Sequence, residues 1–212
     1  MEESSSREKV LKNVRNALLN RQDKPVRDLD LSSSVFYDFE DTLDVTFAQE
    51  LTKAAGNFIF CDSIEKFTSK LRTLMEQKDW NYIQCADKKI HLLLKQARIP
   101  YKYSESALLD AQVGLTGCEY LIARFGSIVV SSKGQSGRRM NIFPETHLVL
   151  AFTSQIVPDI KDAMANLQKK YQSALPSMIS LITGPSRTAD IEKTLVMGAH
   201  GPKNLYVFLV DA

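Results

Sequence analysis

The segment from Thr183 to Thr188 has residue types that could bind an anion. It reads Thr-Gly-Pro-Ser-Arg-Thr and follows an apolar run typical of a buried strand. We expect a helix from about Ser186 to Met197, whose first backbone N–H groups have no partner within the helix and favour negative charge. The Arg187 guanidinium would add a charge-assisted hydrogen bond to a carboxylate or phosphate. The expected ligand contacts are Gly184, Ser186, Arg187 and Thr188, and the alternative is a plain capped turn without a ligand.

A second candidate site lies where glycines mark the beginning of a strand, between Gly114 and Glu119. A glycine has no Cβ atom, so the backbone can approach a bound molecule closely there. Thr116 and Gly117 are therefore expected ligand contacts. Glu119 is the one carboxylate in a motif that could act as an acid, a base or a nucleophile. The alternative is an ordinary turn glutamate that is solvated or ion-paired.

Two further segments carry polar residues that could reach a ligand. The loop from Gly134 to Arg139 is similar in composition to a phosphate-binding loop, but it has neither the Walker spacing nor a following helix. Arg138 is a candidate contact there, and a flexible basic hairpin tip is the alternative. Histidine is a common site residue, and His200 is either a ligand contact or a hydrogen-bond partner of its own turn. For His91 and His147 the sequence identifies no partner.

Composition and charge exclude several classes of function. Lys and Arg number 27 against 25 Asp and Glu, so the chain has no overall cationic field, and we expect no nucleic-acid partner. Cys61, Cys85 and Cys118 lie far apart, without the spacing of a metal or iron–sulfur site, and there is no G-x-G-x-x-G turn for a dinucleotide. No signal peptide and no apolar run of membrane-spanning length is present, so we expect a cytoplasmic protein without a membrane span.

The elements that would position these residues alternate between helix and strand. Helical periodicity is found at 45–55, 64–75, 87–97 and 158–171. Short apolar runs typical of strands are found at 57–60, 80–85, 101–103, 178–183 and 205–210. Such alternation implies parallel strands joined by right-handed helical crossovers, with helices on both faces of the sheet.

The middle of the chain departs from this alternation. Two β-type runs, 120–132 and 146–152, have only a polar loop between them, and we expect them to be antiparallel. The expected fold class is therefore α/β, a mostly parallel sheet sandwiched by helices with an embedded antiparallel hairpin. Residues 1–44 are expected to form an N-terminal helix and a polar arm, and residues 45–212 the α/β domain.

Three segments then suggest a family. They are 114–123 with 126–129, 179–192, and 198–202 leading to 210–211. In that order and at those spacings they resemble the lactate-utilisation (LUD) domain family, protein C type. The resemblance covers the C-terminal half, and the N-terminal half matches only in layout. It implies a fold similar to that of the sugar-phosphate isomerase and CoA-transferase group.

The resemblance also implies a function. The chain would be a component of bacterial L-lactate utilisation, the oxidation of L-lactate to pyruvate, and would bind a small anionic metabolite. It would hold no cofactor itself, because the iron–sulfur clusters would lie on iron–sulfur partner proteins.

Two alternatives stay open. One is a free-standing enzyme acting on a sugar phosphate or an acyl-CoA, with Glu119, Arg187 and His200 as its working residues. In CoA-transferases, whose fold is the implied one, a glutamate attacks the substrate. The other is an interaction module whose N-terminal helix and arm dock to the partners.

Overall fold

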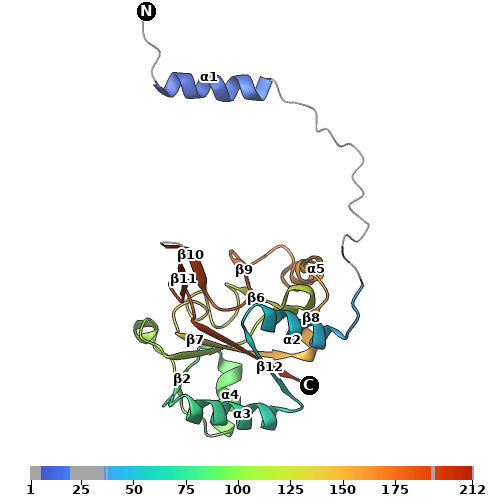
Figure 1. Cartoon of the computed structure of the whole chain (residues 1–212), viewed down its shortest axis with the longest axis vertical. Helices are drawn as coiled ribbons and strands as arrows, with labels where there is room; N and C mark the ends of the chain where they lie inside the picture. Colours follow the sequence, from blue (N-terminus) through green and yellow to red (C-terminus); the bar gives the residue numbers. More distant parts are fainter. Residues whose placement is uncertain (1–5, 20–35, 37, 192–193, 212) are drawn as a thin grey trace, which may run out of the picture. The chain divides into compact units, whose positions relative to one another are not determined.

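The computed structural model describes residues 6–19, 36, 38–191 and 194–211. By its internal contacts the chain divides into two units, Met1–Asp38 and Phe39–Ala212, which are described separately. In the first unit, the helix α1 (Ser6–Leu19) confirms the helix expected near the N-terminus (Figure 1). Most of the expected polar arm lies outside the described residues.

The second unit is built on a six-stranded parallel sheet. Every neighbouring pair of its strands is parallel, which confirms the mostly parallel sheet expected from the alternation. The order across the sheet is β1 (Asn57–Cys61), β12 (Asn204–Val210), β7 (Thr146–Phe152), β4 (Val113–Thr116), β2 (Ile83–Gln84) and β3 (Tyr101–Lys102).

Helices cover one face of this sheet. The helices α3 (Ile64–Gln77) and α4 (Lys88–Gln96) place apolar residues such as Phe67 and Leu94 in one buried cluster with Phe208 of β12. The rings of Phe67 and Phe208 meet edge to face, with centroids 5.3 Å apart. The Asp87 carboxylate accepts hydrogen bonds from the backbone N–H groups of Lys89 and Ile90, so it fixes where α4 begins.

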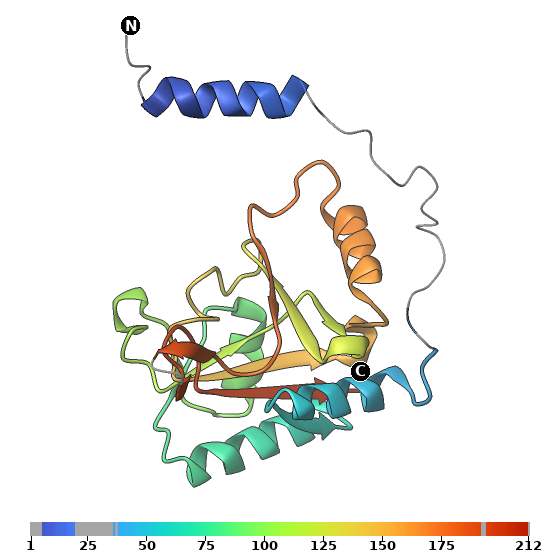
Figure 2. The same cartoon turned by 45° about the horizontal axis from the view of Figure 1, so that its top comes forward.

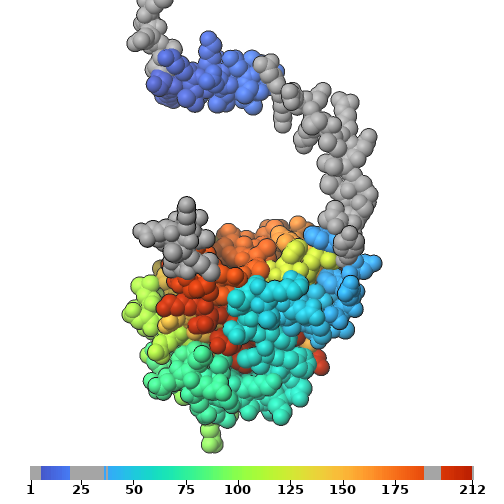
Figure 3. Space-filling view, viewed as in Figure 1, coloured from blue at the N-terminus to red at the C-terminus, as the bar shows by residue number. Residues whose placement is uncertain are grey.

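The opposite face is covered by the helix α2 (Leu43–Lys53) and by a second, four-stranded sheet. The strand order in that sheet is β8 (Ile156–Val157), β5 (Tyr120–Ile122), β6 (Ser127–Ser131) and β9 (Ile179–Ile182). The helix α5 (Ile160–Tyr171) packs on its outer side through Ala163 and Leu167. The layers follow the order helix, sheet, sheet, helix, with α3 and α5 outermost (Figure 2). Helices were expected on both faces of the sheet, but only the face under α3 and α4 is covered by helices alone. The helix α2 lies above α3 in the space-filling view (Figure 3).

The expected antiparallel pairing of 120–132 with 146–152 is wrong. The first run contains β5, a short 3-10 helix (Ala123–Phe125) and β6, which form the antiparallel hairpin within the second sheet. The second run is β7, which pairs parallel with β4 and β12 in the centre of the large sheet. Its residues are buried on both faces, as interior strands of parallel sheets are, and this explains its near-continuous apolar sequence.

The expected helix from Ser186 to Met197 is also wrong. The strands β10 (Arg187–Ile191) and β11 (Thr194–Met197) form a two-stranded antiparallel hairpin there, in which Arg187 pairs with Met197. Thr and the aliphatic β-branched residues favour strands over helices, because their side chains are restricted in a helix. Such residues recur along this run, at Thr188, Ile191, Thr194 and Val196.

One glycine fixes how α2 docks on the second sheet. Gly126, between β5 and β6, has a φ of +57°, a left-handed conformation that other residues rarely adopt. A Cβ atom there would lie 2.2 Å from the backbone nitrogen of Leu51 in α2. The helix therefore rests directly on the backbone of the hairpin turn.

We predict that Gly126→Ala lowers the free energy of unfolding by about 2–4 kcal/mol, because it adds left-handed strain and a clash with rigid backbone. Gly137→Ala is the matched control, since Gly137 also has a positive φ (+63°) but has open space where its Cβ would be. The control should lose only about 1 kcal/mol. Urea unfolding of both variants measures the difference, and equal losses would contradict the contact with α2.

Candidate functional site

A cavity of about 540 Å³ opens at the carboxyl ends of β2, β4 and β7. The segment after β4 contributes Gly117, Cys118 and Glu119, and the start of α4 contributes Asp87, Lys89, Ile90 and Leu93. Its other walls are the end of β6 with the loop after it, the end of β7, and the end of α5. These walls supply Val130, Ser131, Lys133, Gly134, Gln135, Ser136, Gly137, Asn141, Leu150, Phe152, Gln155, Lys170 and Tyr171.

The chain's topology explains why a cavity lies here. The connection after β2 runs through α4 to β3, whereas the connection after β4 runs through β5 and β6 to β7 on the other side. These two connections also cover opposite faces of the sheet. Neighbouring strands whose connections diverge in this way leave a crevice at their carboxyl ends, where α/β proteins bind ligands. Asp87, which follows β2, and Gly117, which follows β4, both line it, and a Cβ atom on Gly117 would lie 3.8 Å from the Asp87 carboxylate.

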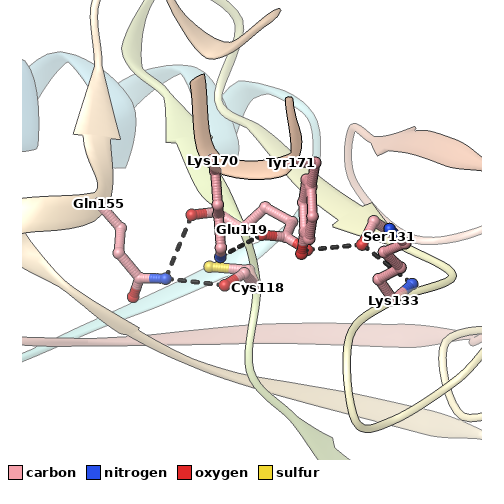
Figure 4. Close-up of polar contacts among 7 residues, drawn as sticks. All are labelled: Cys118, Glu119, Ser131, Lys133, Gln155, Lys170 and Tyr171. Atoms are coloured by element: carbon pink, nitrogen blue, oxygen red, sulfur yellow. Dashed lines mark hydrogen bonds and ion pairs between the residues drawn. The ribbon is translucent and has the colours of Figure 1, made fainter. Parts of the chain in front are cut away.

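Glu119 lies at the centre of a buried polar cluster in this cavity (Figure 4). Its Oε1 accepts hydrogen bonds from the hydroxyls of Ser131 at 2.5 Å and Tyr171 at 2.7 Å. Its Oε2 accepts one from the Lys170 ammonium at 2.7 Å. The Glu119 side chain is 5% exposed and that of Lys170 is 51% exposed, so the amine is the member of the pair that solvent or a ligand can reach.

The cluster keeps Glu119 ionised. Burial by itself raises the pKa of this carboxyl, but the hydrogen bonds from Lys170, Ser131 and Tyr171 together outweigh burial and hold its pKa below the ordinary 4.5. The resulting stabilisation is present above that ordinary value and is lost as the pH falls through the lower folded pKa. Burial lowers the pKa of Lys170, but its hydrogen bond and charge interaction with Glu119 reverse this and leave the pKa raised. Both groups are therefore charged at neutral pH.

The Cys118 thiol beside Glu119 is not an activated nucleophile. Desolvation by its surroundings, with a smaller contribution from the Glu119 charge, raises the pKa of this thiol to about 12. A thiol with such a pKa stays protonated at neutral pH, and only the thiolate is strongly nucleophilic. The backbone at Cys118 is also fixed by the chain after β7, because the Gln155 amide donates a hydrogen bond to the Cys118 carbonyl oxygen at 2.7 Å.

The loop after β6 is anchored on both sides of the cavity. The Gln135 side chain accepts a hydrogen bond from the Lys88 backbone N–H at the start of α4, at 2.9 Å. On the other side, the Lys133 amine donates to the Ala174 carbonyl. Arg138, a candidate contact from the sequence, donates to the Ser177 hydroxyl at 2.6 Å. The structure thus places Arg138 beside the cavity, tied to the chain after α5.

Thr116, another candidate contact, is paired inside the sheet. Its hydroxyl lies 2.8 Å from Nε2 of the fully buried His147 on the neighbouring strand β7. Burial lowers the pKa of His147 to about 4, so the ring is neutral at physiological pH. Sequence spacing gave no sign of this pair, because the two residues meet only through the parallel pairing of β4 with β7.

The segment from Gly184 to Thr188 lies elsewhere, at the end of α2. A Cβ atom on Gly184 would come within 2.1 Å of the Ala54 carbonyl oxygen, and the Arg187 guanidinium donates to the same oxygen. Ala54 is the C-cap of α2, where cationic groups are favourable. Ser186 donates its backbone N–H to Pro202 at 2.9 Å, and Thr188 pairs with Val196. These contacts are structural, and the helix that motivated an anion site here is replaced by a strand.

Of the candidate residues, the structure brings Gly117 and Glu119 together in the cavity. His200 is exposed in the turn before β12. Ser131, Lys170 and Tyr171 were not predicted as site residues, because they belong to the end of a strand and the end of a helix, 12 or more positions after Glu119. The helical periodicity at 158–171 did predict that Tyr171 ends a helix, but not that its hydroxyl meets Glu119.

Among the described residues, no group of three or more His, Cys, Asp or Glu side chains is arranged to hold a metal ion. Within the same residues, every helix is too short or too polar to cross a membrane.

Comparison with known proteins relates the chain to one family. The model of the family described as LUD domain matches residues 46–210. The lactate utilization protein C of Macrococcus caseolyticus is 32% identical over 178 residues, 76% of this chain and 77% of that protein. The lactate utilization protein C of Geobacillus thermodenitrificans is 36% identical over 105 residues, 48% of this chain and 44% of that protein. The match thus spans less than half the length of this relative.

A solved structure shares the fold. It is a crystal structure of a DUF162 family protein from Deinococcus radiodurans, with a TM-score of 0.58 and 19% identity, covering 79% of this chain and 96% of that one. At this identity the likeness shows the α/β fold alone. The similarity to sugar-phosphate isomerases and CoA-transferases stays a prediction.

We predict that Glu119→Gln lowers the free energy of unfolding by about 1.5–3 kcal/mol, because the neutral amide loses the charge that pairs with the Lys170 ammonium and has one acceptor oxygen where the carboxylate has two. The matched control is Glu145→Gln, which removes an exposed ion pair with Lys203 of similar length, 2.9 Å. Exposed pairs are worth about 0–1 kcal/mol. Urea unfolding at pH 7 measures both, and a loss at Glu119 no larger than at Glu145 would show that the cluster is not structural.

We also predict that stability falls by about 1–2 kcal/mol between pH 6.5 and pH 5. In this window the unfolded chain protonates His147, whose ordinary pKa is 6.5, whereas the folded chain, with a pKa of about 4, does not. The window lies above the range in which Glu119 titrates. In His147→Gln the fall should be smaller by that amount, and an unchanged pH dependence in the variant would rule out this cause.

Proposed function

The chain belongs to the LUD domain family, and from that premise we propose that it is a component of L-lactate utilisation that binds a small anionic metabolite in the cavity beside Glu119. The names of its relatives support the pathway. The cavity's position at the carboxyl edge of the parallel sheet supports the ligand site.

The observation that carries the proposal is the exposed Lys170 ammonium at the cavity wall, held by the buried Glu119 carboxylate. The cavity is lined by three lysines, Lys89, Lys133 and Lys170, and by two carboxylates, Asp87 and Glu119. Asp87 caps α4, and Glu119 accepts three hydrogen bonds, one of them from Lys170. Three lysines against two carboxylates leave the lining with one net positive charge, and an anion suits it.

We place the anion at Lys170 and not at Arg187, because the Arg187 guanidinium already serves the end of α2. Glu119 then holds the Lys170 amine in place, and the two remaining N–H groups of that ammonium can donate to the ligand. A carboxylate with both oxygens occupied suits this role better than nucleophilic attack. The rival proposal, an enzyme for sugar phosphates or acyl-CoA, needs Glu119, Arg187 and His200 at one site, and only Glu119 lines this cavity.

The electrons of lactate oxidation would pass to iron–sulfur partner proteins. Cys61, Cys85 and Cys118 are free, and the first two are buried. Cys61 ends β1, Cys85 follows β2 and Cys118 follows β4. Their thiols are not gathered as the ligands of a cluster would be. We therefore propose that this chain acts beside proteins that hold the clusters.

A test combines growth and binding. A strain lacking the gene should fail to grow on L-lactate, and the gene with Lys170→Met should restore growth poorly. Lys169→Met, which removes the adjacent exposed lysine of α5, is the matched control and should restore growth fully.

By calorimetry, Lys170→Met should bind L-lactate or pyruvate roughly 10–100-fold more weakly than the parent, as expected for the loss of a charge-assisted contact. Normal growth without the gene would overturn the lactate role, and unchanged binding would overturn the site.

A further inference from the structure

The cavity is far larger than lactate or pyruvate requires. Cavities of roughly 300–1,000 Å³ bury drug-sized ligands, and at about 540 Å³ this one falls within that range. A three-carbon acid bound at Lys170 would leave most of the space to water.

Four large apolar side chains also line the cavity. Ile90 and Leu93 line it from α4, and Leu150 and Phe152 line it from the end of β7. Leu93 and Phe152 are only partly buried, although they pack against the main core. Contact between apolar surface and water is unfavourable, so a ligand that covers this surface gains binding free energy.

The anionic head and the apolar body of a ligand would contact different elements. Lys170, Glu119 and the Tyr171 hydroxyl come from the end of α5 and the segment before β5, whereas the apolar side chains come from α4 and β7. The start of α4 also contributes the charged side chains of Asp87 and Lys89. A molecule that satisfies both walls has an anionic head at one end and an apolar body at the other.

We propose that the natural ligand is a molecule larger than lactate, with an anionic carboxylate or phosphate group at one end and an apolar body at the other. This rests on the proposed anion site at Lys170 and adds the class of molecule. The head lies at Lys170, and the body lies against Leu93 and Phe152. Carboxylate and phosphate heads share this chemistry.

Two acids that differ only in an apolar body test the inference. L-Lactate and L-3-phenyllactate carry the same 2-hydroxycarboxylate, and only the second has a ring. Calorimetry on the full chain should show phenyllactate binding roughly 10–100-fold more tightly, the gain expected from burying one phenyl group. Phenylphosphate compared with inorganic phosphate repeats the comparison for the other head group.

Variants locate the two ends of the ligand. Leu93→Asn should weaken phenyllactate roughly tenfold and leave lactate unchanged. The matched control is Leu92→Asn, since Leu92 is the neighbouring α4 residue, 63% exposed and outside the cavity lining. Lys170→Met should weaken both acids by a similar factor. Thermal melting verifies that each variant folds, and Leu93→Ala replaces Leu93→Asn if the latter does not.

The outcomes separate this inference from the proposed function. Equal affinities for lactate and phenyllactate, both dependent on Lys170, would overturn the apolar body and leave the anion site standing. A preference for phenyllactate that survives both Leu93 variants would place the ring elsewhere and overturn the inference. If no acid depends on Lys170, the anion site itself fails, and the inference fails with it.

Discussion

The buried carboxylate of Glu119 joins three parts of the molecule through one side chain. It follows β4 of the large sheet and precedes β5 of the second sheet, and its oxygens bind Ser131 at the end of β6 and Lys170 and Tyr171 at the end of α5. A buried charge is tolerated only when its partners compensate its lost hydration. The relative positions of the two sheets and of α5 at this edge are therefore closely constrained. The cavity takes its shape from that constraint.

The elements that could be predicted from the sequence are those with a clear helical or strand periodicity of their own. The helices α3 and α4 and the strand β2 between them were predictable, because alternation of this kind admits few topologies. The second sheet was not, since β5 and β6 are short and their partners β8 and β9 lie far along the chain. The hairpin β10–β11 was missed because a Gly-Pro-Ser turn after a strand suits a helix start as well as a hairpin.

The candidate site shows the same division between local and remote information. Glu119 could be recognised from its own segment, because glycines and a carboxylate stand together there. Its partner Lys170 lies 51 positions away in the sequence, so only the fold reveals the pair. The Thr116–His147 pair could not be predicted for the same reason, because the two residues lie on paired parallel strands whose connection separates them in the sequence. A single sequence therefore indicates which residues have the chemistry but not which of them meet.

Two of the segments that resemble the family differ in position, since one lines the cavity and the other contacts the end of α2. The segment from Gly114 leads into the cavity and ends at Glu119, whereas Gly184 and Arg187 hold the end of α2. Gly126 holds the same helix from the hairpin turn. Because α2 covers the sheet face on which the second sheet rests, these contacts act on the cavity only through the packing of the layers. A distinctive motif can therefore mark a requirement of the fold, and the chemistry of a site has to be argued from the residues that line it.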